Sequence, residues 1–173
     1  KVDPDEFAAA VRADTFLASV MLVNNEVGTI QDVATIAEKT REASKFLGGS
    51  LLIHTDAVQG AGKLSLNVND LGVDLLSLSA HKIYGPKGVG ALYVKRGVEL
   101  EPLIAGGGQE RQRRSGTENV ANIVGFGEAI TLAESERIES QDRLKQLANK
   151  LVEGVADRIP NSSFNGSKTD RVP

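Results

Sequence analysis

The 173-residue sequence contains no cysteine, which excludes disulfide bonds and cysteine-ligated metals within it. Two histidines argue against a histidine-rich zinc site, although carboxylates could still bind a hard cation. The net charge of −3 lacks the basic excess typical of proteins that bind nucleic acid or anionic membranes. No apolar run is long enough to span a bilayer, and no secretory signal opens the chain. We therefore expect a globular protein, cytoplasmic by default, with no metal, nucleic-acid or membrane partner.

The alternation of apolar runs with helical patterns predicts an α/β fold. Near-continuous apolar runs predict buried strands at residues 15–23, 51–56 and 73–80, and a fourth strand, antiparallel if its turn is hairpin-like, at 91–94. Helical patterns cover residues 4–13, 33–45 after an Asp32 cap, and 122–158 with one or two breaks. Together these elements predict a mostly parallel sheet with helices on both faces.

The character of the sequence changes near residue 130, from glycine-rich α/β to charged helix. We expect residues 1–130 to be part of a large domain, and residues 131–173 to be a helical connector that leads into a smaller C-terminal domain. The chain begins without Met and ends soon after the turn-like residues 160–166, so we expect an interior piece of a longer protein.

Polar side chains follow three of the predicted strands. They are Asn24, Asn25 and Glu26 after the first, Asp56 and Gln59 after the second, and Ser79, His81 and Lys82 after the third. Ligands of open α/β sheets bind just beyond the carboxyl ends of strands. If these strands are neighbours, the polar groups therefore converge on one crevice.

Lys82 and Asp56 are the candidates for chemistry in this crevice. A desolvated lysine loses its proton more readily, and its neutral amine can form a Schiff base with a carbonyl cofactor. A buried carboxylate requires a cationic partner, and a protonated pyridine nitrogen would serve. On residue type alone, a solvated lysine and a turn aspartate remain open, as do structural roles for Ser79 and His81.

Four motifs occur in order: NNEVG at 24–28, HTDAVQ at 54–59, SAHKIYGPKG at 79–88 and RSGT at 114–117. Together they resemble the NifS/IscS-type cysteine desulfurases, in the class-V aminotransferase group of fold-type-I enzymes that use pyridoxal 5′-phosphate (PLP). The resemblance covers about residues 15–130 and is weaker beyond them. The HKIYGPKG and RSGT forms are more similar to this branch than to the SufS-like branch.

The resemblance implies roles for individual residues. Lys82 would bind PLP as a Schiff base and later move the substrate's Cα proton, and Asp56 would pair with the pyridinium nitrogen. The remaining implied contacts are Gln59 to the phenolic oxygen, Ser79 and His81 to the phosphate, Asn25 to the substrate carboxylate, and Thr117 to the phosphate of the other subunit of a homodimer.

The implied reaction removes sulfur from L-cysteine, leaving L-alanine, and passes it as an enzyme persulfide to an acceptor such as an iron–sulfur scaffold protein. The family's persulfide-forming cysteine and the histidine that stacks on PLP belong to stretches not present here. We therefore expect the parent protein to be active and these 173 residues alone to be inactive. Another class-V PLP enzyme (a selenocysteine lyase, a kynureninase or an aminotransferase) and a non-catalytic α/β binding module remain alternatives.

Overall fold

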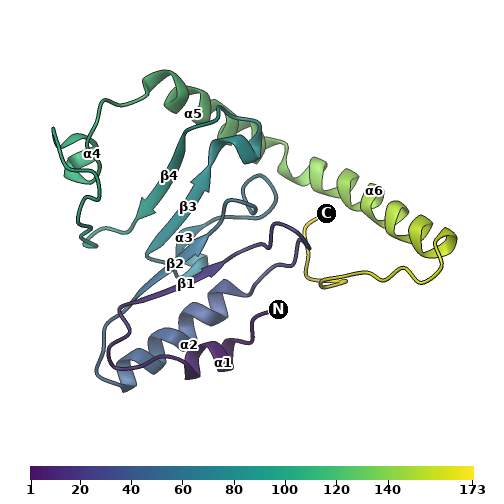
Figure 1. The fold of residues 1–173 in the computed structure, drawn as a ribbon, viewed down its shortest axis with the longest axis horizontal. Coiled ribbons are helices and arrows are strands. Elements are labelled where there is room, and N and C mark those ends of the chain that lie inside the picture. Colours follow the sequence, from purple (N-terminus) through teal and green to yellow (C-terminus); the bar gives the residue numbers. More distant parts are fainter.

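The computed structural model describes residues 1–173 and contains one four-stranded sheet, in the order β1-β2-β3-β4, with helices around it (Figure 1). Its strands are β1 (Leu17–Met21), β2 (Leu52–Asp56), β3 (Leu75–Ser79) and β4 (Gly90–Val94). The first three strands are parallel, and β4 is antiparallel to β3. The mostly parallel sheet with helices predicted from the sequence is confirmed, and so is its antiparallel fourth strand.

The helices follow the predicted pattern with three differences. They are α1 (Pro4–Ala9), α2 (Val33–Phe46), α3 (Val68–Leu71), the 3₁₀ turn η1 (Ala80–Ile83), α4 (Gln109–Gln112), α5 (Val120–Ser135) and α6 (Arg137–Arg158). The short helices α3 and α4 were not predicted. Helix α1 ends four residues before the predicted end, and beyond it the N–H of Arg12 donates to Thr15 Oγ1 rather than to a helical carbonyl. None of these helices combines the length and apolar character needed to span a bilayer.

Helix α2 covers one face of the sheet. Its N-cap Asp32 accepts a hydrogen bond from the Thr35 N–H, as the sequence predicted. The buried side of α2, through Ile36 and Ala37, packs in one cluster with strand residues that include Val20 and Ile53. Removing this apolar surface from water is the main force that holds the helix on the sheet.

Successive side chains of a strand point to opposite faces, and the two faces of this sheet differ. In β1 and β2 the buried positions alternate with more exposed ones. Ala18, Val20, Ile53 and Thr55 lie on the buried face with α2. The opposite face carries polar side chains and is the more exposed of the two within residues 1–173.

A second apolar cluster fixes the turn after β3. Ala80 and Ile83 of η1 pack with Phe126 of α5. The helix can approach this turn only because position 125 is glycine: a Cβ there would lie 2.8 Å from Pro86 Cγ. The backbone that carries residues 80–83 is therefore held between the sheet and α5.

The C-terminal segment returns to the main core after α6. Val172 is buried in the same cluster as α2, and its N–H donates to the Gly28 carbonyl at 3.0 Å. Helix α5 itself runs through residue 130 to Ser135. The division into two domains near residue 130 stays a prediction.

Candidate functional site

The carboxyl ends of β1, β2 and β3 lie at one edge of the sheet because the three strands are parallel. In the register, Met21 of β1 and Ser77 of β3 both pair with Asp56. Ser79 ends β3 two residues beyond Ser77, and η1 with Lys82 follows directly. The structure therefore brings the predicted residues of β2, β3 and η1 to the same edge.

Asp56 ends β2 with an incompletely satisfied carboxylate. Its Oδ1 accepts a hydrogen bond from the Val58 N–H at 2.9 Å. No lysine, arginine or histidine forms an ion pair with it. A half-buried carboxylate without a cation in its own chain is suited to bind a cationic group of a ligand.

Ser79 and His81 form a hydrogen-bonded pair next to Lys82. Ser79 Oγ lies 2.8 Å from His81 Nδ1. The 3₁₀ turn ends at Tyr84, whose left-handed backbone (φ +63°) lets the chain reverse. The Gly85 N–H closes the turn by donating to the Ala80 carbonyl at 2.9 Å. The turn thus presents the hydroxyl, the imidazole and the amine within four residues.

Lys63 is a second lysine at this site, and the sequence did not single it out. Burial lowers the pKa of Lys63, and the positive charge of Lys82 lowers it further. Its Nζ donates to the Gln59 carbonyl at 3.0 Å. The predicted residue Gln59 is therefore joined to this lysine through its backbone.

Asn25 and Thr117 come from two further segments, the loop after β1 and the loop before α5. Both are exposed, and neither hydrogen-bonds to another predicted site residue. The loop of Asn25 is ordered by its neighbour Asn24, whose Oδ1 accepts from the N–H groups of Glu26 and Val27. The roles implied for Asn25 and Thr117 stay predictions.

His54, the first residue of the HTDAVQ motif, is a further residue at this edge, and no role was predicted for it from the sequence. Its Nδ1 lies 2.7 Å from Ser19 Oγ, and its Nε2 lies 2.9 Å from Ser77 Oγ. Burial lowers the pKa of His54, and the nearby charge of Asp56 opposes that shift. The i, i+2 spacing of His54 and Asp56 on a strand was the available signal, because it places both side chains on one face.

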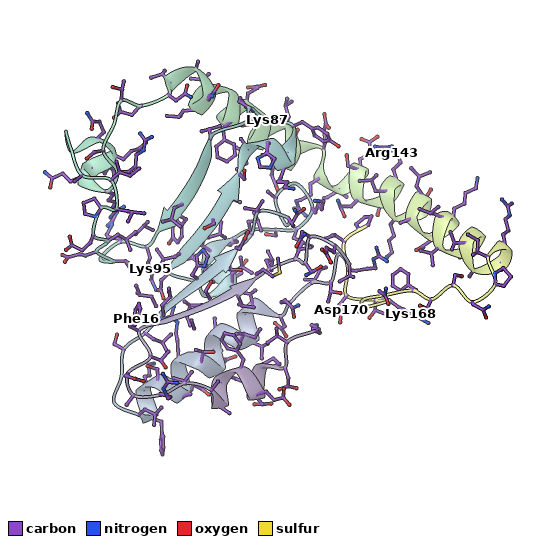
Figure 2. The ribbon with its side chains drawn as sticks, viewed as in Figure 1. Phe16, Lys87, Lys95, Arg143, Lys168 and Asp170 are labelled. Carbon is purple, nitrogen blue, oxygen red and sulfur yellow. The ribbon has the colours of Figure 1, made fainter.

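A cavity of about 740 Å³ lies between α6 and the C-terminal segment, where Figure 2 labels Lys168 and Asp170. Among its lining residues are Lys63, Arg137 and Lys168. The cavity shares Lys63 with the site at the strand ends, and no other residue of that site lines it.

Residues 1–172 match the model of the aminotransferase class-V family. The chain therefore belongs to this family, and its sheet with surrounding helices is that of a fold-type-I transferase. The chain is 47% identical over 172 residues to the cysteine desulfurase IscS of Dictyoglomus turgidum. That match covers 99% of this chain but 42% of the relative, so the chain spans less than half the length of this curated relative.

Solved structures give the same result. A NifS-like protein superposes with a TM-score of 0.85 at 46% identity, over 90% of this chain and 42% of the other. A structure described as SspA in complex with cysteine superposes with a TM-score of 0.69 at 44% identity, over 75% of this chain and 36% of the other. The similarity therefore extends from the four motifs to the arrangement of the backbone.

Proposed function

We propose that the protein containing this chain is a PLP-dependent cysteine desulfurase, and that residues 1–173 supply its cofactor-binding lysine. One observation carries the proposal: Asp56, the Ser79–His81 pair and Lys82 lie at one carboxyl edge of parallel strands in a class-V chain. L-Cysteine is the proposed substrate because a relative at 47% identity is named cysteine desulfurase and a similar structure is described as a complex with cysteine.

The residues at this edge fit PLP. Ser79 and His81 supply hydrogen-bond donors for a phosphate, and the carboxylate of Asp56 has no cation of its own. Lys82 is exposed within residues 1–173, which differs from the desolvated setting considered from the sequence, and it takes part in no salt bridge. Bound PLP supplies an electron sink for negative charge that develops at the Cα atom of an amino acid.

Each side chain then has a distinct task. Lys82 would hold the cofactor through its amine and would afterwards move the proton at the substrate's Cα. Asp56 would pair with the pyridine nitrogen and favour its protonated form. Ser79 and His81 would anchor the phosphate, and Gln59 would hydrogen-bond to the phenolic oxygen.

In the proposed reaction sulfur leaves L-cysteine and L-alanine remains. Because residues 1–173 contain no cysteine, the thiol that accepts the sulfur would lie elsewhere in the protein. The homodimer with Thr117 at the neighbouring site, the iron–sulfur scaffold acceptor and the cytoplasmic location stay predictions.

The test uses the full-length protein. We expect a visible absorbance band that borohydride bleaches, that Lys82→Ala abolishes, and that the matched variant Lys87→Ala, in the same turn, retains. We also expect alanine to be released from L-cysteine. A band that survives Lys82→Ala would rule out the lysine assignment, and turnover of kynurenine or selenocysteine in place of L-cysteine would rule out the desulfurase.

A further inference from the structure

The loop after β1 is a short hairpin that begins at the carboxyl edge of the sheet. The N–H of Leu22 donates to the Asp56 carbonyl at 2.8 Å, so the loop starts beside the residue that ends β2. Val23 and Ile30 then form an antiparallel bridge that closes the hairpin. Asn25, whose predicted contact is the substrate carboxylate, lies in the turn between these two bridge residues.

The turn is tied to its own second arm, residues 28–30. The Asn24 N–H donates to the Thr29 carbonyl at 2.9 Å, and the Gly28 N–H donates to the Asn24 carbonyl at 3.1 Å. The residue directly before Asn25 is therefore hydrogen-bonded twice to the second arm. The backbone position of Asn25 depends on where that arm lies.

The segment after α6, residues 166–172, is paired with this second arm (Figure 1). The Ile30 N–H donates to the Asp170 carbonyl at 2.9 Å, and the Val172 N–H donates to the Gly28 carbonyl at 3.0 Å. These bonds run in both directions between the two stretches, as in an antiparallel pair. The arm that holds the turn is thus itself held by a segment more than 130 residues further along the chain.

Side-chain contacts make this pairing specific. Thr29 is buried, and its Oγ1 accepts a hydrogen bond from the Ser167 N–H at 3.1 Å. Gly166 has a φ of +93°, and a Cβ at that position would lie 2.9 Å from Val27 Cβ. The segment can therefore approach the hairpin this closely only because position 166 is glycine.

We propose that residues 166–172 are a positioning segment for Asn25, and through it for the carboxylate of the amino-acid substrate. The Asn25 side chain is exposed, so its direction follows the backbone that carries it. Residues 166–172 hold that backbone at the strand-end edge. The effect on the substrate rests on the proposed function and on the contact predicted for Asn25. The pairing with the hairpin rests on neither, because all its contacts lie within this chain.

The pairing is tested first in the full-length protein without cofactor, by amide hydrogen exchange of residues 22–31. Gly166→Ala adds the Cβ that collides with Val27. Gly97→Ala is the matched control, because its φ of +89° imposes similar backbone strain while nothing lies within 4 Å of the added Cβ. We expect exchange to become about tenfold faster in Gly166→Ala and to stay unchanged in Gly97→Ala. Equal exchange in the two variants would overturn the pairing.

Thr29→Val is a milder second variant, which removes only the acceptor of the Ser167 N–H and keeps the size of the side chain. It serves if Gly166→Ala does not fold. We expect the same direction of change in exchange, at a smaller size. Exchange that Thr29→Val leaves unchanged would contradict a role for this contact.

The effect on the substrate is tested by alanine release from L-cysteine. We expect Gly166→Ala to raise KM about tenfold and to leave kcat within about twofold, because the carboxylate is bound but does not react. Cysteamine has the amine and thiol of cysteine without the carboxylate, and its inhibition constant should not change. Equal losses of affinity for L-cysteine and cysteamine would indicate a general structural defect and overturn the positioning role.

A double-mutant cycle with Asn25→Ala tests the path through that residue. If residues 166–172 act through Asn25, Gly166→Ala should raise KM no further once Asn25 is alanine. Effects on KM that simply add would show that the segment acts independently of Asn25, and would overturn the proposal.

The two proposals fail in different ways. If the unmodified protein shows no cofactor band that depends on Lys82, the proposed function is wrong, and hydrogen exchange still decides the pairing. If the band is present and alanine is released, but Gly166→Ala leaves the KM for L-cysteine unchanged, only the positioning role is wrong.

Discussion

The two ends of the sheet hold their aspartates in opposite ways. Asp74 lies just before β3, and its side chain is only 5% exposed. Its carboxylate accepts from the Ile53 N–H at 2.9 Å, from Arg41 Nη2 at 2.6 Å and from Lys95 Nζ at 3.1 Å. Lys95 follows the end of β4, and Lys87 precedes its start, as labelled in Figure 2.

Asp56 is at the other end, where its carboxylate accepts one backbone hydrogen bond and has no cationic partner. A buried charge requires compensation by hydrogen bonds and an opposite charge. The chain itself supplies this compensation to Asp74, which makes Asp74 a structural group. At Asp56 the compensation is missing, which is the difference that we expect of a carboxylate that binds a ligand.

Replacing each of the two aspartates by alanine is expected to give the largest difference in the free energy of unfolding. Asp74→Ala leaves a buried N–H and two cations without their acceptor, so we expect the free energy of unfolding to fall by about 3 kcal/mol. Asp56→Ala removes one hydrogen bond and should cost about 1 kcal/mol or less. Urea unfolding of the two variants of the full-length protein measures both values. Equal losses would show that Asp56 is as structural as Asp74.

Local patterns were sufficient to predict one aspartate but not the other. Asp56 follows an apolar run directly, so its place at a strand end could be predicted from neighbouring residues. Asp74 also lies in a predicted strand, yet its partners come from α2 and from beyond β4. Ion pairs between residues 21 and 33 positions apart depend on packing, which no local pattern specifies.

The same limit explains why His54 was passed over. The strands, the Asp32 cap and the antiparallel fourth strand follow from local signals of hydrophobicity and turn chemistry. The hydrogen bonds that join His54 to Ser19 and Ser77 require the register of three strands. A shift of one residue would place the His54 side chain on the opposite face. No local pattern in the sequence determines that register.

The next effect separates the two cations around Asp74. The Arg41 side chain is 31% exposed, and its Nη2 also donates to the Gly72 carbonyl at 2.9 Å. We expect Arg41→Ala to lower the free energy of unfolding by about 1.5 kcal/mol. Arg41→Lys should restore only part of this, because one ammonium cannot reproduce the planar guanidinium fork. Full recovery in Arg41→Lys would show that charge alone matters.

A smaller effect is expected on the dependence of stability on pH. Burial alone would raise the pKa of Asp74, but the Ile53 N–H, Arg41 and Lys95 lower it below its usual value. Its contribution is therefore complete above about pH 3.9 and is lost as the pH falls through the lower folded pKa. In the unmodified protein this loss should appear as a decrease of the urea midpoint at low pH. We expect the part of that decrease that Asp74 causes to be absent in Asp74→Asn.

His54 is expected to cause a second decrease in stability, at a higher pH than that of Asp74. Burial lowers its pKa, so below about pH 6.5 the unfolded chain binds a proton that the folded protein does not. Stability from this group is complete above that pH and falls as the pH drops toward the folded pKa. His54→Gln should remove this decrease in stability and leave the decrease caused by Asp74 in place. If the decrease below about pH 6.5 persists in His54→Gln, another group causes it.

The smallest effect is expected at Lys95, and it tests whether exposure decides the value of a partner. The Lys95 side chain is 53% exposed, and its ion pair with Asp74 spans 3.1 Å. Solvent and salt screen such a pair, so we expect Lys95→Ala to cost about 0.5 kcal/mol at low salt and nothing measurable at 1 M salt, where the Debye length is about 3 Å. The loss in Arg41→Ala should persist at 1 M salt because part of it is a hydrogen bond to a backbone carbonyl. Lys95→Ala could instead lower the free energy of unfolding as much as Arg41→Ala does at both salt concentrations. In that case the stabilisation of Asp74 depends on total positive charge, and Asp74 and Asp56 differ in nearby charge rather than in buried hydrogen bonds.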